Sequence, residues 1–389
     1  MPLPLYLLAL AVFAMGTSEF MLAGLLPALA TDLGVPLGAA GGLTSAFALG
    51  MVVGAPLMAV LARNRPGRGS LLGFVLLFAA AHVVGAVTGS FPVLLGSRLV
   101  AALADAGFLA VALSTATALV PPDRKGRALG VLLSGTTLAT VAGVPCGSVL
   151  GALFGWRAAF WAVAGLCLPA AVGIARGLPA VPATPGTAGT AGASGASALG
   201  AEFGQLRRPR LLRAMLLAAL VNAATFGGFT FLAPVVTGAT GPGGPWVPVA
   251  LVLFGAGSFA GVTAAGRLAD RRPGLVVTVA GPLLLLGWPL LALTAGRPAT
   301  LFALVFLLGA LSFAVGGTLI TRVLYEAAGA PTLAGAYATA ALNAGAAVGP
   351  LVAATTIGTA AGALGPACAA GALVAAALLI AAVRPSPTG

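Results

Sequence analysis

The sequence predicts an all-α membrane protein with twelve transmembrane helices arranged in two six-helix bundles. Of its 389 residues, 60% are hydrophobic and only 7% are charged, whereas a soluble domain carries about 25% charged residues. The apolar residues fall into twelve runs that are each long enough to cross a bilayer. A stretch rich in Pro, Gly, Ala, Ser and Thr separates the first six runs from the last six. The chain therefore requires lipid as its solvent.

The twelve spans follow one another with short connections. They are expected at 4–30, 38–61, 70–89, 91–118, 127–153, 156–176, 210–236, 246–268, 274–295, 298–322, 333–357 and 361–383. Residues 1–177 then form the N-terminal bundle and residues 210–389 the C-terminal bundle. Residues 178–209 are expected to be a flexible cytoplasmic linker, because such a composition offers no face that can pack. The first run is too long for a signal peptide and is expected to stay as a helix.

The charges in the loops predict the orientation of the chain. If both termini are cytoplasmic, the outside loops hold only Arg157 and Arg297, and nearly all other basic residues face inward. We therefore expect a multi-pass protein of the bacterial inner (cytoplasmic) membrane. This asymmetry also explains the net charge of +12, with membrane lipid as the partner of the basic loops and no nucleic acid required.

Small residues at a spacing of four recur on every third helix, namely the second, fifth, eighth and eleventh. The fifth helix has the longest series, which consists of Gly135, Ala139, Gly143, Gly147 and Gly151. Small residues in this pattern let two helix backbones approach closely. The series on the fifth helix would be hard to produce by chance, whereas the other three could arise from the abundance of Gly and Ala in the chain.

Polar residues inside the membrane fall on a different set of helices. Glu19 lies in the first span, Arg98 and Asp105 in the fourth, Asn222 in the seventh and Arg322 in the tenth. Both series repeat every three helices, as a three-helix unit used four times would require. Nested three-helix repeats in two halves are a known transporter architecture.

Several motifs show a family resemblance. GLLPALATDLG ends the first span, LLGSRLVAALADAG opens the fourth, PPDRKGRALG follows it, GVPCGSVLGALFGWRAAF lies in and after the fifth, GRLADRRP follows the eighth and LNAGAAVG lies in the eleventh. With these motifs the chain resembles the major facilitator superfamily, its twelve-helix drug:proton antiporters and, within them, the bacterial chloramphenicol-resistance exporters. The resemblance implies the major facilitator fold with a substrate cavity between the first, fourth, seventh and tenth helices.

The resemblance also implies gating segments. By position, these residues are Asn64, Arg65, Gly67, Arg68, Gly143, Pro145, Gly147, Gly266, Asp270 and Arg271. Asn64 stands where family members usually have Asp, so this position lacks the negative charge that a latch between the halves would use. Pro145 is expected to bend the fifth helix where it packs closely.

Glu19, Asp105 and Arg98 are the candidates for proton coupling. A charged carboxylate at mid-bilayer costs several kcal/mol, so Glu19 must be protonated, paired or facing water. Arg98 cannot lose its proton and can tune the carboxyls. The alternatives are a permanently neutral acid at Glu19 or a purely structural pair between Arg98 and a carboxylate. His82 lies on the third helix, apart from these groups, and is interpreted as a bystander.

The candidate substrate-binding residues combine aromatic rings with hydrogen-bonding groups, as a moderately apolar aromatic ligand requires. They are Glu19, Phe20, Phe108, Asn222, Thr225, Phe226 and Phe229. Core packing is the alternative for each phenylalanine.

The predicted function is proton-coupled export of a small antibiotic, with chloramphenicol as the substrate that the resemblance implies. A sugar or purine nucleoside exporter of the same fold is the alternative, and a plain uptake carrier of that fold is a further possibility. The single histidine excludes a two-histidine zinc motif, and Lys125 is not part of a phosphate-binding loop, so an enzyme or an ATP-driven pump is not expected. A receptor would not need mid-membrane carboxylates. We expect no metal and no cofactor, the proton gradient as the energy source, and a monomer.

Overall fold

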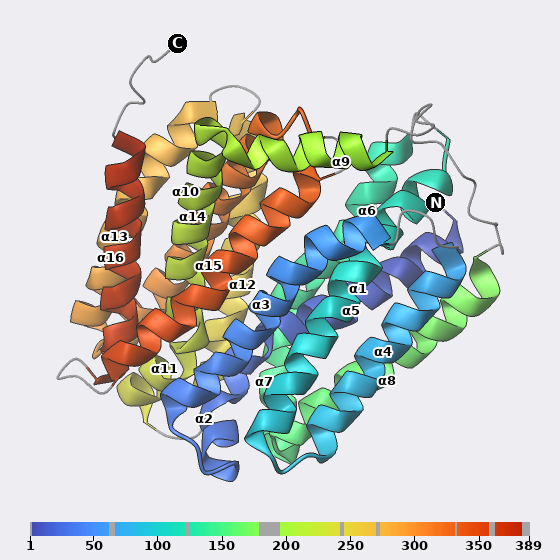
Figure 1. Ribbon diagram of the computed structural model, residues 1–389. Helices are drawn as coiled ribbons and strands as arrows, with labels where there is room; N and C mark the ends of the chain where they lie inside the picture. Colours follow the sequence, from blue (N-terminus) through green and yellow to red (C-terminus); the bar gives the residue numbers. More distant parts are fainter. Residues whose placement is uncertain are drawn as a thin grey trace.

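The computed structural model is a bundle of long helices (Figure 1). The structure describes residues 2–61, 67–121, 124–178, 195–241, 245–269, 273–330, 333–357 and 362–382. Within these residues, 12 helices are long and apolar enough to cross a membrane. The predicted fold class is confirmed, and each of these helices falls on one of the expected spans.

The N-terminal half contains the first six spans. Its elements are α1 (Leu3–Phe20), α2 (Leu22–Asp32), α3 (Leu37–Leu61), α4 (Gly67–Val87), α5 (Phe91–Ala118), α6 (Lys125–Leu138), the π-helix η3 (Ala139–Gly143), α7 (Val144–Phe154) and α8 (Trp156–Gly177). The segment α6–η3–α7 forms one continuous span. Pro145 has no N–H to donate to the carbonyl of Val141, and the wider π turn lies just before this proline.

The C-terminal half begins after the connection between the halves. Its elements are α9 (Gly195–Gly204), the 3-10 turn η4 (Gln205–Arg207), α10 (Pro209–Thr230), α11 (Leu232–Thr240), α12 (Trp246–Ala269), α13 (Pro273–Thr294), α14 (Pro298–Glu326), α15 (Ala334–Ile357), the 3-10 turn η5 (Gly362–Leu364) and α16 (Gly365–Ala382). The start of α1 and the end of α16 lie at the same face of the bundle (Figure 1). We call this face, which the loop charges predict to be cytoplasmic, the inner face.

The segment 178–209, expected to be an irregular linker, is partly helical. Residues 195–204 form α9, which lies across the inner face (Figure 1). The Glu202 carboxylate accepts a hydrogen bond of 3.0 Å from the backbone N–H of Leu333, and the Tyr337 hydroxyl donates to the Glu202 carbonyl at 2.9 Å. The expectation of an unstructured segment up to Pro209 is therefore wrong for its last part, because these contacts give α9 a place to pack.

The first and seventh spans are each broken at an equivalent place. The first is divided into α1 and α2 at Met21, and the seventh into α10 and α11 at Phe231. In the seventh span, Pro234 lacks the N–H that would bond to the carbonyl of Thr230. The two breaks support a repeated architecture in the two halves.

The small-residue series lie at helix–helix contacts within each half. A Cβ on Gly135 would overlap the carbonyl of Ala9 in α1, and one on Gly349 would overlap the carbonyl of Ala223 in α10. The other two series behave alike: Gly50 of α3 faces α5, and Gly261 of α12 faces α14. The fifth and eleventh spans thus pack on the first and seventh, while the second and eighth pack on the fourth and tenth.

Each half has its own hydrophobic core, and the two halves also contact each other. The contacts between halves join α2 with α11, α3 with α15, and both η3 and α7 with α12. They include Gly38 against Ala354 and Gly255 against the backbone of Thr140. These glycines mark places where the two halves approach each other at backbone distance.

Candidate functional site

A buried polar cluster lies in the N-terminal half, where α1, α4 and α5 meet. Arg98 of α5 is 1% exposed, so its charge must be balanced by protein groups. Its Nη1 donates a 2.7 Å hydrogen bond to the Ser18 hydroxyl, and its Nη2 donates a 2.9 Å bond to the Ser18 carbonyl. The guanidinium also lies over the Phe47 ring at 4.4 Å. None of these three contacts involves a carboxylate.

The two predicted proton carriers lie near Arg98 without binding it. Glu19 follows Ser18 on α1 and is half-buried, whereas Asp105 of α5 is buried. The positive charge of Arg98 acts electrostatically on both carboxyls. Among the described residues, neither carboxyl forms a hydrogen bond or an ion pair with the guanidinium. The structure brings the three predicted residues together, and it does not contain the permanent pair that was one of the alternatives.

His82, which the sequence analysis set apart as a bystander, lies within this polar cluster. Its Nε2 lies 2.7 Å from the Ser18 hydroxyl, and its Nδ1 lies 2.8 Å from the Phe78 carbonyl. The histidine is therefore joined to Arg98 through Ser18. Sequence reasoning missed Ser18 altogether, and its position next to Glu19 was the only signal available.

A cluster of phenylalanine rings lies where the two halves meet. The Phe20 ring at the end of α1 is 5.5 Å from Phe226 and 6.2 Å from Phe229, both in α10. Phe229 in turn contacts Phe254 of α12 at 4.6 Å, and Phe254 contacts Phe313 of α14 at 6.2 Å. We call these five residues the aromatic cluster. Sequence reasoning proposed the first three and missed the other two.

The remaining predicted substrate residues have different surroundings. Phe108 is fully buried in the core of the N-terminal half. Asn222 Nδ2 donates a 2.7 Å hydrogen bond to the carbonyl of Leu342 in α15, and Thr225 donates its hydroxyl to Val221 within α10. Part of the hydrogen-bonding capacity of these two polar groups is thus used inside the C-terminal half.

The predicted gating residues lie partly beyond the described chain. Asn64, Arg65, Asp270 and Arg271 fall outside the residues that the structure describes. Gly67 and Arg68 begin α4, and Gly266 lies near the end of α12 with open space at its Cβ position. Gly143 and Gly147, on either side of Pro145, face Thr17 and Met21 of the first span.

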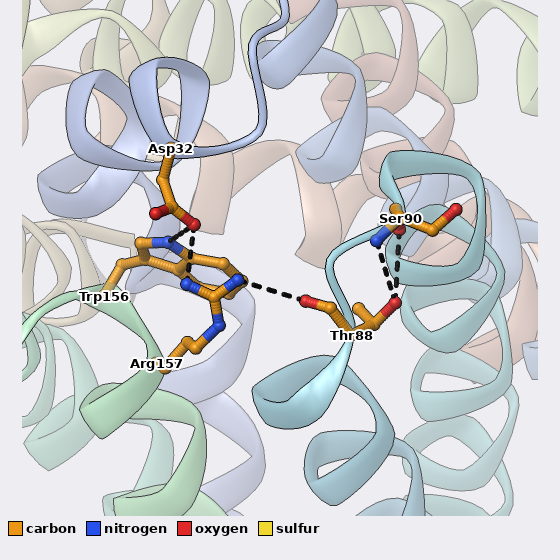
Figure 2. A network of polar contacts seen from close by, with 5 residues as sticks. All are labelled: Asp32, Thr88, Ser90, Trp156 and Arg157. Carbon is orange, nitrogen blue, oxygen red and sulfur yellow. Dashed lines mark hydrogen bonds and ion pairs between the residues drawn. The ribbon is translucent and has the colours of Figure 1, made fainter.

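A second polar network fastens α2 at the outer end of the N-terminal half (Figure 2). Arg157 Nη1 donates to Asp32 Oδ2 at 2.6 Å, and Trp156 Nε1 donates to the same oxygen at 3.1 Å. Arg157 Nη2 reaches the Thr88 carbonyl at 3.3 Å, and its guanidinium stacks on Trp156 at 4.4 Å. The bonds from Arg157 and Trp156 lower the pKa of the Asp32 carboxyl below its ordinary value. We call this network the outer clamp.

The described residues contain no group of three or more His, Cys, Asp or Glu side chains that could hold a metal ion.

Comparisons with known proteins agree on one family. A family model described as Major Facilitator Superfamily matches residues 8–350. The chain is 70% identical over 381 residues to a protein of Streptomyces lividans named "Chloramphenicol resistance protein", covering 98% of this chain and 96% of that one. It is 34% identical over 348 residues to the "Inner membrane transport protein YdhP" of Escherichia coli K12, covering 89% of this chain and 86% of that one.

Solved structures show the same fold. A bacterial homologue of the human lysosomal transporter Spinster, in an inward-facing and unoccupied conformation, superposes with a TM-score of 0.74 at 20% identity, covering 98% of this chain and 94% of that one. The human organic anion transporter MFSD10 superposes with a TM-score of 0.66 at 21% identity, covering 97% of each chain.

Proposed function

Because the chain belongs to the major facilitator superfamily, we propose that it is a proton-coupled exporter of chloramphenicol in the bacterial inner membrane. The 70% identical relative carries chloramphenicol resistance in its name. The drug itself has a nitrophenyl ring, two hydroxyls and an amide, which suit aromatic faces together with a few hydrogen-bonding groups.

The observation that carries this proposal is the adjacency of Glu19 and Phe20 at the end of α1. The half-buried Glu19 carboxyl is the group that exchanges the proton, and the Phe20 ring belongs to the aromatic cluster that joins the two halves. Because the two side chains share one helix end, a drug that displaces Phe20 also changes the surroundings of Glu19. Proton and drug are coupled by this short connection.

The mechanism that we propose is alternating access. The drug enters from the cytoplasm or the inner leaflet and packs against Phe226 and Phe229, and Glu19 or Asp105 then releases its proton inward. The halves rock about the aromatic cluster, the drug leaves outward, and a proton from outside resets the carrier. Arg98 supplies a fixed positive charge that tunes both carboxyls. The proton gradient supplies the work, without a cofactor, and one chain contains the whole pathway as a monomer.

The test is drug accumulation in a sensitive bacterium that expresses the chain. Radiolabelled chloramphenicol is measured with and without a protonophore for wild type, Glu19→Gln and Glu326→Gln. Glu326 is a half-buried glutamate at the end of α14, far along the chain from the polar cluster, and its variant is the matched control. We expect low accumulation in wild type and in the control, and high accumulation with the protonophore or in Glu19→Gln.

Other outcomes redirect the proposal. If wild type and empty vector accumulate the drug equally, chloramphenicol is not the substrate, and labelled sugars and purine nucleosides are tested next. If Glu19→Gln still exports the drug, proton exchange is sought at Asp105, with Asp105→Asn as the variant.

A further inference from the structure

We propose that His82 is a positioning residue for proton coupling: through the Ser18 hydroxyl it holds Arg98 away from Glu19 and Asp105. This inference rests on the proposed function, because it concerns the same coupling groups. It assigns a role to a side chain that touches neither drug nor carboxyl.

The hydrogen bonds define the chemical form of His82. A carbonyl oxygen can only accept, so His82 Nδ1 carries a hydrogen and donates it to Phe78 at 2.8 Å. The Ser18 hydroxyl accepts from Arg98 Nη1 at 2.7 Å and has one hydrogen to give. In a neutral imidazole Nε2 then bears no hydrogen, and it accepts the hydrogen of the Ser18 hydroxyl at 2.7 Å. These two bonds fix the tautomer of the neutral ring.

The packing of the ring keeps it in this position. His82 is 1% exposed, and its ring lies 4.3 Å from Phe78 and 5.7 Å from Phe160. It cannot turn without breaking these contacts. The Ser18 hydroxyl thus has one orientation, with its lone pairs directed at the guanidinium.

The consequence appears at Arg98. Ser18 accepts from both terminal nitrogens, and Phe47 covers one face of the guanidinium. Within the described chain, Nε has no hydrogen-bond partner, yet neither Glu19 nor Asp105 is bound. An arginine that paired with either carboxyl in two parallel bonds would hold that carboxyl in its charged form. His82 and Ser18 prevent that pairing and leave the carboxyls free to exchange protons.

A histidine that merely fills the core behaves differently on substitution. Phenylalanine keeps the ring and the contacts with Phe78 and Phe160 but removes the acceptor for Ser18. Glutamine loses the ring but returns an acceptor oxygen at similar reach. If His82 is only a core residue, His82→Phe should disturb the protein less than His82→Gln. If His82 positions Arg98, His82→Gln should disturb proton coupling less than His82→Phe.

The first test needs no drug. A hydrophobic carbodiimide modifies protonated carboxyls in apolar surroundings, and mass spectrometry of the full-length protein in membranes measures its incorporation at Glu19 and Asp105. At pH 7 we expect His82→Phe to lower the summed labelling about fivefold or more, because the released guanidinium pairs with a carboxyl. We expect His82→Gln to restore it, and the pH needed for half-maximal labelling to be lower in His82→Phe than in wild type. Equal labelling and equal pH profiles in wild type and His82→Phe would overturn the proposal.

A second variant and a transport assay complete the design. Ser18→Ala removes the hydroxyl that connects His82 with Arg98 and leaves the imidazole ring in place. It must therefore also lower the carbodiimide labelling, even if His82→Phe does not fold. In vesicles, His82→Phe is expected to lower the maximal rate of drug transport while the KM stays near the wild-type value. If wild type does not transport chloramphenicol but the labelling differences are present, the substrate is wrong and the positioning role stands.

Discussion

The Phe20 ring, at the end of α1, lies 5.5 Å from the Phe226 ring in α10, and the two planes are tilted by 32°. Phe20 also meets Phe229 edge to face at 78°. A side chain of the first half is thus packed into the hydrophobic core of the second. Any movement of one half against the other changes the contacts of Phe20, which is why the residue next to it is well placed to couple a proton to that movement.

Replacing Phe226 with leucine is expected to weaken chloramphenicol binding. A favourable aromatic pair contributes about 0.5–1.5 kcal/mol beyond area burial, so the Kd should rise about two- to tenfold. Equilibrium binding to purified protein in detergent measures it. Phe108→Leu is the matched control, because Phe108 is buried in the N-terminal core; it should lower the thermal unfolding midpoint and leave the Kd unchanged. Equal Kd values for both variants would remove Phe226 from the drug site.

Replacing Gly349 with alanine is expected to destabilise the C-terminal half. The new methyl group would overlap the backbone carbonyl of Ala223, so α15 and α10 must move apart. Overpacking of this kind costs about 1–3 kcal/mol, and a lower thermal midpoint in detergent would report it. Gly316→Ala in α14 is the control, because a Cβ at Gly316 meets nothing within 4 Å. Equal midpoints for the two variants would show that the helices can adjust.

The spans and their contacts were predictable because lipid imposes strong rules. Each span must be a long apolar run, and close backbone approach in lipid requires small side chains. The series from Gly135 to Gly151 therefore identified a real contact with the first span. Glu19, Arg98 and Asp105 were also identifiable, since a charge within an apolar run is costly and rarely accidental.

The individual contacts within the site were not predictable, because no comparable rule relates the side chains of different spans. Ser18 and Arg98 are 80 residues apart in sequence, and no periodicity relates a serine in one span to an arginine in another. His82 looked isolated because its partner is an unremarkable serine. Phe254 and Phe313 are ordinary apolar residues in their own helices, and only the meeting of α10, α12 and α14 makes them part of a cluster.

The outer clamp gives a prediction about pH. Bonds from Arg157 and Trp156 hold the pKa of Asp32 below its ordinary value, so the stabilisation is fully present above that ordinary value, about 3.9. It is lost as the pH falls through the lowered pKa. Thermal unfolding should therefore show Asp32→Asn less stable than wild type from pH 8 down to about 5, with the difference shrinking below about 4.

The control for the clamp is Glu326→Gln, which also removes one carboxylate but lies in α14, outside the network. It should match wild type across the same pH series. A difference between Asp32→Asn and wild type that grows as the pH falls would contradict the assigned direction.

Removing the Glu202 carboxylate is expected to release α9. This carboxylate accepts from the Leu333 N–H just before α15 begins, and the same N–H also donates to the Ala330 carbonyl at 3.1 Å; a hydrogen bond of this kind contributes about 0.5–1.5 kcal/mol. Hydrogen–deuterium exchange should be faster in α9 and in the first turn of α15 for Glu202→Ala. Glu202→Gln keeps an acceptor oxygen and should give an intermediate rate. Unchanged exchange in both variants would mean that the contact does not hold α9 in place.

Gly255 allows a prediction about the movement between halves. A Cβ at this position in α12 would lie 2.5 Å from the carbonyl oxygen of Thr140 and 2.9 Å from Val141 Cα, both in η3 of the other half. Gly255→Ala should therefore leave each core intact and disfavour only the arrangement in which these segments touch. A cost of about 1–3 kcal/mol shifts such an equilibrium about 5- to 150-fold.

This shift in the equilibrium can be measured with a cysteine introduced at a buried position of the same junction. Ser148 of α7 is buried and lies against Gly24 of α2, close to Leu251 of α12. With Cys146 and Cys368, the two exposed cysteines, replaced by serine, Ser148→Cys should react faster with an impermeant maleimide added outside the cell when Gly255→Ala is present. Gly316→Ala in the same background should leave the rate unchanged. Overpacking within one half would lower the thermal unfolding midpoint and would not expose Ser148→Cys. Faster labelling at an unchanged midpoint would therefore show that Gly255→Ala acts on the contact between the halves.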